Sequence, residues 1–288
     1  MFINGKIKDY IKQMPALPVS AQRVIEICGG VNVNPYDLNR VISLDPVLTG
    51  RMLQLLIMSY KGLGPHVTSL VRAVTMLGIN TVKNLAISAA KSALLPKNKN
   101  PSGMDMTGFW SHSYCVAVIT KLLAEKKGID PIFHEEYFIS GLLHDIGMLP
   151  LNSLFPAEYV SFKNINNEAF YGNKALLAAE KKQLGINHCK AGEIIAKAWK
   201  LEWPVADVIA YHHEPSFYSG VNSNIVFTVA IADYFSHVYA MDLAGDKKCE
   251  KPDFHIWLTS GIRENAFDEI KEAVYDEMNK AKEFLRIS

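Results

Sequence analysis

The chain has 288 residues, which is enough for one large domain or two modest ones with a real hydrophobic core. Its 30 basic and 29 acidic residues leave a formal net charge of +1, so charge gives no sign of a nucleic-acid or anionic-membrane partner. The 4 cysteines lie far apart without a CxxC pair, and no apolar run is long enough for a signal peptide or membrane span. Composition therefore predicts a soluble protein in a reducing, cytoplasmic setting.

The first third of the chain predicts short helices. Helix-period apolar patterns recur there and strand alternation does not. Ser20 is the expected N-cap of a helix that ends at Gly29-Gly30. Asn34-Pro35 and Asp45-Pro46 predict two further helix starts, because an Asx cap followed by proline suits the first helical turn. Helices are also expected at 69–77, stopped by Gly78, and at 81–95. The pattern over residues 1–98 therefore predicts a small helical bundle.

Residues 96–106 have the composition of a linker. Pro, Gly, Asn and Lys cluster there without apolar periodicity, so we place a domain boundary at this point. Residues 107–288 then form a second helical unit that ends in an amphipathic helix at 262–285. The predicted fold class is all-α, with an N-terminal helical bundle followed by a second helical domain.

The second unit carries an unusual pair, His144-Asp145, at the end of an apolar run. Asp130 is the expected N-cap of a helix over 131–146, with Pro131 at its first position and Gly147 as its stop. Two adjacent ionisable groups are costly to bury unless something compensates them, and a metal ion can do so. Helices are also expected at 107–126, from His188 after the N-cap Asn187, from Pro204 to Pro215, and from Asn224 onward.

Similar metal-ligand types recur near helix ends or within the apolar helices that follow. The candidate ligands are His112, His144, Asp145, His188, His212, His213 and Asp233. A single buried histidine is more often a hydrogen-bonded core residue, but so many together favour one shared metal site. Imidazole with carboxylate suits iron, manganese, zinc, nickel or cobalt rather than magnesium alone, as a mononuclear or dinuclear centre.

The remaining histidines fit the site less well. His66, His134 and His255 stand in polar or loop contexts and are expected to be structural or on the surface. His237 follows Asp233 by one helical turn, so it is either a supporting neighbour of the site or an ordinary helix residue.

The order of these residues resembles the ligand series of the HD superfamily of metal-dependent phosphohydrolases. The surrounding sequence resembles one branch, the HDOD domain (HD-related output domain), over roughly residues 14–235. The matching segments are Met14-Pro15-Ala16-Leu17-Pro18, Leu44-Asp45-Pro46-Val47-Leu48-Thr49, Ala73-Val74-Thr75-Met76-Leu77-Gly78, Phe109-Trp110-Ser111-His112-Ser113, Gly141-Leu142-Leu143-His144-Asp145-Ile146-Gly147, Leu184-Gly185-Ile186-Asn187-His188 with Gly192 and Trp199, and Ile209-Ala210-Tyr211-His212-His213-Glu214-Pro215. The resemblance implies an all-helical fold, a bacterial cytoplasmic setting and a role in signal transduction.

The resemblance also implies roles for the ligands. Asp145 would bridge two ions, with one further ligand set of His112, His144 and Asp233 and another of His188, His212 and His213. The related HD-GYP cyclic-dinucleotide phosphodiesterases carry a lysine where this chain has Met148, and a Gly-Tyr-Pro motif that is missing after His213-Glu214. A phosphate-pairing cation is therefore missing from the motif, which argues against hydrolysis of cyclic dinucleotides.

Two functions are left open by the sequence. The leading one is a bacterial HDOD-type signal-transduction protein with a retained His/Asp metal site and weak or no catalysis. Its metal-bearing C-terminal half would support binding of a signalling protein partner. The alternative is an active metal-dependent phosphohydrolase of a nucleotide, cyclic nucleotide or other small phosphate ester, with Asp145 as the catalytic residue. No basic run interleaves with aromatics, so nucleic-acid binding is not expected, and neither is membrane binding. A homodimer is compatible with the sequence.

Overall fold

The structure, a computed structural model, describes residues 2–14, 18–28, 33–59, 70–79, 81–82, 104, 106–166, 173–201, 204–239 and 250–285. Every regular element in these ranges is a helix, which confirms the predicted all-α fold. The helices are α1 (Phe2–Gln13), α2 (Pro18–Cys28), α3 (Pro35–Ile42), α4 (Pro46–Ser59), α5 (Leu70–Leu77), α7 (Met106–Lys126), η1 (Pro131–Phe133), α8 (His134–Leu143), α9 (Met148–Leu154), α10 (Pro156–Asn166), α11 (Asn173–Leu184), α12 (His188–Trp199), α13 (Val205–Tyr211), η2 (Pro215–Phe217), α14 (Ser223–Val238), α15 (Phe254–Ser260), η3 (Ala266–Glu269) and α16 (Lys271–Leu285). None of the described helices is long and apolar enough to cross a membrane.

Four of the predicted Asx caps are confirmed. Asn34 accepts a hydrogen bond from Tyr36 N at 2.9 Å at the start of α3. The carboxylate of Asp45 accepts from two backbone N–H groups, Val47 N at 2.9 Å and Leu48 N at 3.1 Å. The caps Asp130 and Asn187 accept from the backbone N of Ile132 and Lys190 in the same way. Each cap satisfies N–H groups that have no partner within the helix.

Two other predicted caps are wrong. Ser20 lies buried inside α2, which begins at Pro18, because proline fixes a backbone angle that suits the first helical position. Asn224 lies in the first turn of α14, which begins at Ser223. Its side chain instead accepts a hydrogen bond from Lys127 Nζ.

The predicted helix over 131–146 is divided. Residues 131–133 form η1, α8 ends at Leu143, and residues 144–147 form a turn before α9. Gly147 is not the predicted stop of this helix, because α8 has already ended at Leu143 and the φ of Gly147 is −68° rather than left-handed. The helix expected to end in 211–214 stops at Tyr211, and the one expected at 262–285 is interrupted before α16. Nearly all of the predicted helix 81–95 and linker 96–106 lies outside the described residues.

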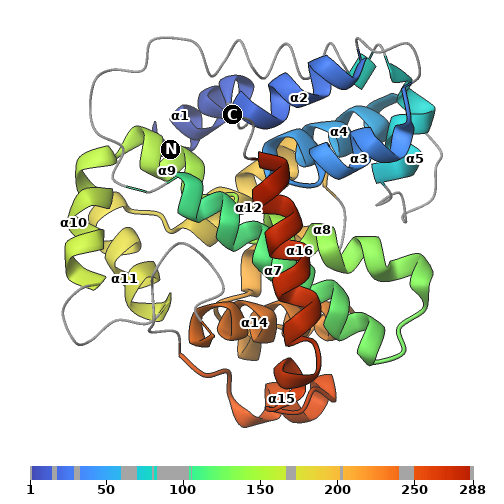
Figure 1. The fold of residues 1–288 in the computed structure, drawn as a ribbon. Coiled ribbons are helices and arrows are strands. Elements are labelled where there is room, and N and C mark those ends of the chain that lie inside the picture. The colour runs from blue at the N-terminus through green and yellow to red at the C-terminus, as the bar shows by residue number, and fades with distance from the viewer. Residues whose placement is uncertain are drawn as a thin grey trace.

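Two hydrophobic clusters meet along α7, which crosses the middle of the molecule in Figure 1. The first cluster joins α1–α5 to α8, α9 and α12, and α7 contributes Phe109 and Trp110 to it. The second cluster joins the rest of α7 to α14, α15 and α16, with Phe235 and Phe267 fully buried. His112 lies between these two stretches of α7, at the place where the two clusters adjoin.

The first cluster contains side chains from both sides of the predicted domain boundary. The ring of Trp199, on α12, lies so close to Gly50 of α4 that a Cβ at this glycine would stand 2.1 Å from the indole. A side chain at residue 50 would therefore push the first helices away from α12. The boundary between residues 98 and 107 stays a prediction.

Candidate metal centre

All of the predicted ligands meet at one buried place. His112 lies on α7, His144 and Asp145 in the turn after α8, His188 at the start of α12, His212 and His213 directly after α13, and Asp233 within α14. No more than 9% of any of these side chains is exposed. The fold itself gathers residues that are far apart in the sequence, since His112 Nε2 lies 3.2 Å from Asp233 Oδ1.

Asp145 is the centre of this arrangement. Its Oδ1 lies 3.1 Å from His212 Nε2 and 3.4 Å from His188 Nε2. Its Oδ2 lies 3.3 Å from His144 Nε2 and 3.8 Å from His112 Nε2. Because the two oxygens face different imidazoles, the carboxylate is suited to bridging two cations.

The ligand atoms form two groups, and within each group all lie within 4.8 Å of one another. One group is Asp145, His188, His212 and His213, and the other is His112, His144 and Asp233. This is the division that the resemblance implied for two ions. That these residues bind metal stays a prediction.

The other ring nitrogens are held by acceptors. His144 Nδ1 lies 2.7 Å from the carbonyl of Gly141, and His212 Nδ1 lies 3.1 Å from the carbonyl of Val208. A carbonyl only accepts, so these Nδ1 atoms carry the proton and donate it. In the neutral ring Nε2 then keeps its lone pair, which points toward Asp145 and is available to a metal.

Sequence reasoning missed Glu180, a fully buried carboxylate on α11. Glu180 Oε2 accepts hydrogen bonds from His188 Nδ1 at 2.7 Å and His188 N at 2.8 Å, and Tyr159 donates its hydroxyl to Oε1 at 2.6 Å. A carboxylate behind a ligating histidine fixes the ring and raises its basicity. The only signal in the sequence is a glutamate eight residues before a predicted ligand, and this spacing alone does not indicate a contact.

His237 lies beside the centre. Its Nδ1 donates to the backbone carbonyl of Asp233 at 2.9 Å and lies 3.2 Å from Asp233 Oδ1, while its ring centroid is 4.7 Å from that of His112. His134 instead contacts the carbonyl of Ile129, outside the cluster. The ring of His255 packs near Phe227, and His66 lies outside the described residues.

Gly147 places the ligand turn directly against α12. A Cβ at Gly147 would stand 1.9 Å from the carbonyl oxygen of His188 and 2.5 Å from Gly192 N, both backbone atoms. Gly192 in turn faces Ile209, whose Cγ2 would be 2.4 Å from an added Cβ. The glycine at 147 therefore allows two backbones to touch, which brings Asp145 within reach of His188.

The electrostatics favour a cation. Burial raises the pKa of Asp145, but His144, His212 and His188 outweigh burial and hold that pKa well below its usual range. Burial lowers the pKa of His213 well below its usual range. Within the described chain, every ion pair of Asp145 is made with a histidine and none with lysine or arginine. Burying a carboxylate is costly unless a positive charge is present, and a bound cation would supply one where no lysine or arginine pairs with Asp145.

Two buried ring nitrogens in the centre are without a hydrogen-bond partner in the described part of the chain. Among the described residues, His188 Nε2 and His213 Nδ1 make no hydrogen bond. Buried polar atoms are normally satisfied, so each calls for a partner. The donor set of imidazoles and carboxylates is one that divalent transition metals prefer. The residues present therefore fit a divalent metal ion.

Comparison with known proteins identifies the family. A family model described as the HDOD domain matches residues 14–215, which is more than half of the chain. The chain belongs to the HDOD family. The match includes six of the candidate ligands and ends before Asp233, so the case for Asp233 in this HDOD protein rests on its geometry.

The HDOD fold is shared with several solved structures. A virulence factor from Campylobacter jejuni is similar with a TM-score of 0.64, at 17% identity over 100% of both chains. The response regulator MmoQ from Methylococcus capsulatus has a TM-score of 0.62, at 18% identity over 95% of this chain and 98% of its own. An HDOD domain protein of unknown function from Geobacter sulfurreducens has a TM-score of 0.56, at 22% identity over 99% and 98% of the two chains.

A curated relative is longer than this chain. An uncharacterized protein from Treponema pallidum is 25% identical over 232 residues, which is 78% of this chain but 43% of the relative. The chain thus spans less than half the length of the curated relative it matches.

Proposed function

We propose that this chain is a regulatory HDOD protein whose buried centre binds divalent transition-metal ions, one in each ligand group, and supports binding of a signalling partner. The observation that carries this proposal is the position of Asp145, whose two oxygens face the two groups. Bound metal would connect α7, the turn after α8, α12, α13 and α14, and so stabilise the surface that these helices present. Iron, manganese, zinc and nickel are the candidate metals.

Weak or absent turnover is part of the same proposal. Met148 packs its side chain against the first hydrophobic cluster, at the place where HD-GYP enzymes resemble this chain but carry a lysine. A substrate phosphate would lack a cation there. MmoQ, which shares the fold, is described as a response regulator, and this supports a regulatory role here by likeness of fold.

The test begins with the metal content of the purified full chain, measured by inductively coupled plasma mass spectrometry. We expect close to two equivalents of transition metal in the wild type and none in Asp145→Ala. The matched control is His134→Ala, which removes a histidine that lies outside the centre and should keep the full metal content. Equal metal content in the wild type and Asp145→Ala would refute the proposal.

One observation favours the alternative, a metal-dependent phosphohydrolase. A pocket of about 180 Å³ opens beside His212, His213 and Asp233, and Lys174 and Lys251 line it. These lysines, each ion-paired to a surface glutamate, could supply the phosphate-pairing charge that Met148 does not. A metal ion held by these residues would supply an activated water, and Asp145, which would hold the centre together, is the catalytic residue of this alternative.

Turnover assays distinguish the two functions. The metal-loaded chain would be incubated with mononucleotides, cyclic nucleotides and a simple aryl phosphate in the presence of manganese or iron. The regulatory proposal expects no turnover of these substrates. Turnover by the wild type that is lost in Lys174→Gln and Lys251→Gln, with metal content unchanged, would favour the phosphohydrolase over the regulatory function.

A further inference from the structure

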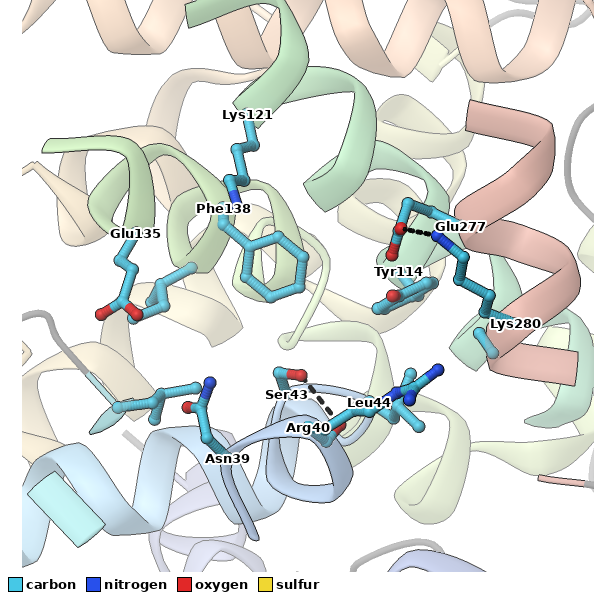
Figure 2. Close-up of a pocket in the computed structure, with 13 residues that line it drawn as sticks. Asn39, Arg40, Ser43, Leu44, Tyr114, Lys121, Glu135, Phe138, Glu277 and Lys280 are labelled. Atoms are coloured by element: carbon cyan, nitrogen blue, oxygen red, sulfur yellow. Dashed lines mark hydrogen bonds and ion pairs between the residues drawn. The ribbon is translucent and has the colours of Figure 1, made fainter. Parts of the chain in front are cut away.

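A second cavity, separate from the metal centre, lies where α3, α7, α8 and α16 approach one another (Figure 2). Its volume is about 540 Å³, in the size range typical of small-molecule sites. The charged side chains that line it are Arg40, Lys121, Lys280, Glu135 and Glu277. Three cations against two carboxylates leave one excess positive charge, so the cavity favours a ligand with an anionic group.

Two of the three cations, Arg40 and Lys280, lie at one end of the cavity, and Lys121 lies away from them. In Figure 2 Arg40, Tyr114 and Lys280 lie on the same side of the cavity, and Lys280 is already paired with Glu277 at 2.7 Å. Tyr114 lines the cavity, and its hydroxyl can donate a hydrogen bond. A guanidinium beside a hydroxyl donor is a suitable partner for a phosphate or carboxylate.

The other end needs a hydrogen-bond donor. Within the described residues, Asn39 Oδ1 and Glu135 Oε2 are buried and make no hydrogen bond. Both line the cavity, and Figure 2 shows them on the side away from Lys280. Both atoms accept hydrogen bonds, so a ligand that supplies the missing donors must carry N–H or O–H groups at that end.

An aromatic ring stands between the two ends. Phe138 lies between Glu135 and Tyr114 in Figure 2, and the rings of Phe138 and Tyr114 meet edge to face with centroids 5.9 Å apart. The side chain of Phe138 is only partly buried, so part of it borders the cavity. A flat ring of a ligand can pack on such a surface.

From these three features we propose that the cavity is a nucleotide-binding site, in which the base packs on Phe138. The exocyclic amino group of the base donates to Glu135 and Asn39, and the phosphate binds Arg40 and Tyr114. The site goes beyond the proposed function and does not need the metal. It is placed to act as an effector site, because Tyr114 lies on α7 two residues after His112, and α8 carries Glu135 and Phe138 and leads into His144.

The test is isothermal titration calorimetry on the full chain, both as purified and after dialysis against EDTA. The ligands are AMP, GMP, CMP and the cyclic mononucleotides, and the comparison compounds are adenosine, ribose 5-phosphate and inorganic phosphate. We expect at least one amino-bearing nucleotide to bind more tightly than all three comparison compounds. This result is independent of metal binding, so a failure here is distinct from a failure of the metal proposal.

Variants then assign the binding to the cavity. Arg40→Gln and Glu135→Gln should each lower the affinity for the nucleotide by roughly tenfold, because each removes a charge-assisted hydrogen bond. Tyr114→Phe removes a single hydroxyl and should weaken binding less. Arg23→Gln is the matched control, since Arg23 lies on α2 and pairs with Glu26 rather than lining the cavity. Circular dichroism melting confirms that each variant is folded.

The proposal is overturned if none of the nucleotides binds, or if binding disappears when the metal is removed. It is also overturned if inorganic phosphate binds as tightly as the nucleotide, which would mean a simple anion site. Binding by Arg40→Gln and Glu135→Gln equal to that of Arg23→Gln would place the ligand elsewhere on the protein.

Discussion

Replacing Glu180 by glutamine tests whether the buried carboxylate behind His188 supports the metal centre. Glu180 accepts from His188 Nδ1, His188 N and the hydroxyl of Tyr159 at 2.6 to 2.8 Å. Glutamine keeps the shape but offers one oxygen and an NH₂ group in place of two oxygens. One of the three donors must therefore face another donor or turn away, and the charge behind His188 is lost.

The expected loss is in metal affinity. Removing a carboxylate that orients a ligating histidine typically costs 10–100-fold in affinity, or about 1.4–2.8 kcal/mol. Burial lowers the pKa of His188, but the Glu180 carboxylate outweighs burial and raises that pKa well above its usual value. Without Glu180 the ring is less basic and less well oriented, so both causes weaken the bond to a metal in the group that contains His188.

The assay is competition with a chromophoric chelator, which reports the affinity of each ion. Glu193→Gln is the matched control, because Glu193 lies on α12 as well but pairs with Lys190 on the surface. We expect the wild-type affinity for the control and a loss of at least tenfold for Glu180→Gln. Equal affinities of the two variants for both ions would show that the carboxylate does not support the centre.

Three further results are expected. His112→Ala should lose one equivalent of metal and keep the other, measured by mass spectrometry, because His112 belongs to only one ligand group; loss of both ions would argue against two groups. Gly147→Ala should destabilise the fold by about 3 kcal/mol in urea unfolding, since the added Cβ meets two backbone atoms, whereas Gly5→Ala, with open space around it in α1, should be neutral or stabilising. Met148→Lys should restore at most weak hydrolysis of cyclic dinucleotides, because the Gly-Tyr-Pro segment is also missing; brisk turnover by the wild type would contradict the assignment of Met148.

The fold was largely predictable because local signals are strong in this chain. An Asx side chain before a helix satisfies free N–H groups, and such caps at Asn34, Asp45 and Asn187 were read correctly. The prediction of Ser20 as an N-cap was wrong because a serine inside the first turn looks the same in the sequence as a cap, unless Pro18 is recognised as the start of the helix. Local rules locate helices, but they do not fix which of several nearby residues begins one.

The gathering of the candidate ligands was predictable for a different reason. Adjacent ionisable residues in an apolar run need compensation, so His144 and Asp145 signal a site without any knowledge of the fold. Glu180 gives no such signal, because it stands beside lysines on a helix whose other face is polar. Its burial depends on α11 lying against His188 and Tyr159, and only the tertiary structure shows that contact.

Gly147 shows how one residue can be identified correctly and explained wrongly. The sequence suggested a helix stop, which requires a left-handed backbone, yet its φ is −68° and alanine could adopt that conformation. What excludes alanine is the carbonyl of His188, 1.9 Å from where a Cβ would lie. Because His188 and Asp145 belong to the same ligand group, any shift of this contact moves two candidate ligands relative to each other. The glycine next to the ligand turn therefore sets the distance between Asp145 and α12, and the geometry of the centre depends on a residue that contributes no ligand atom.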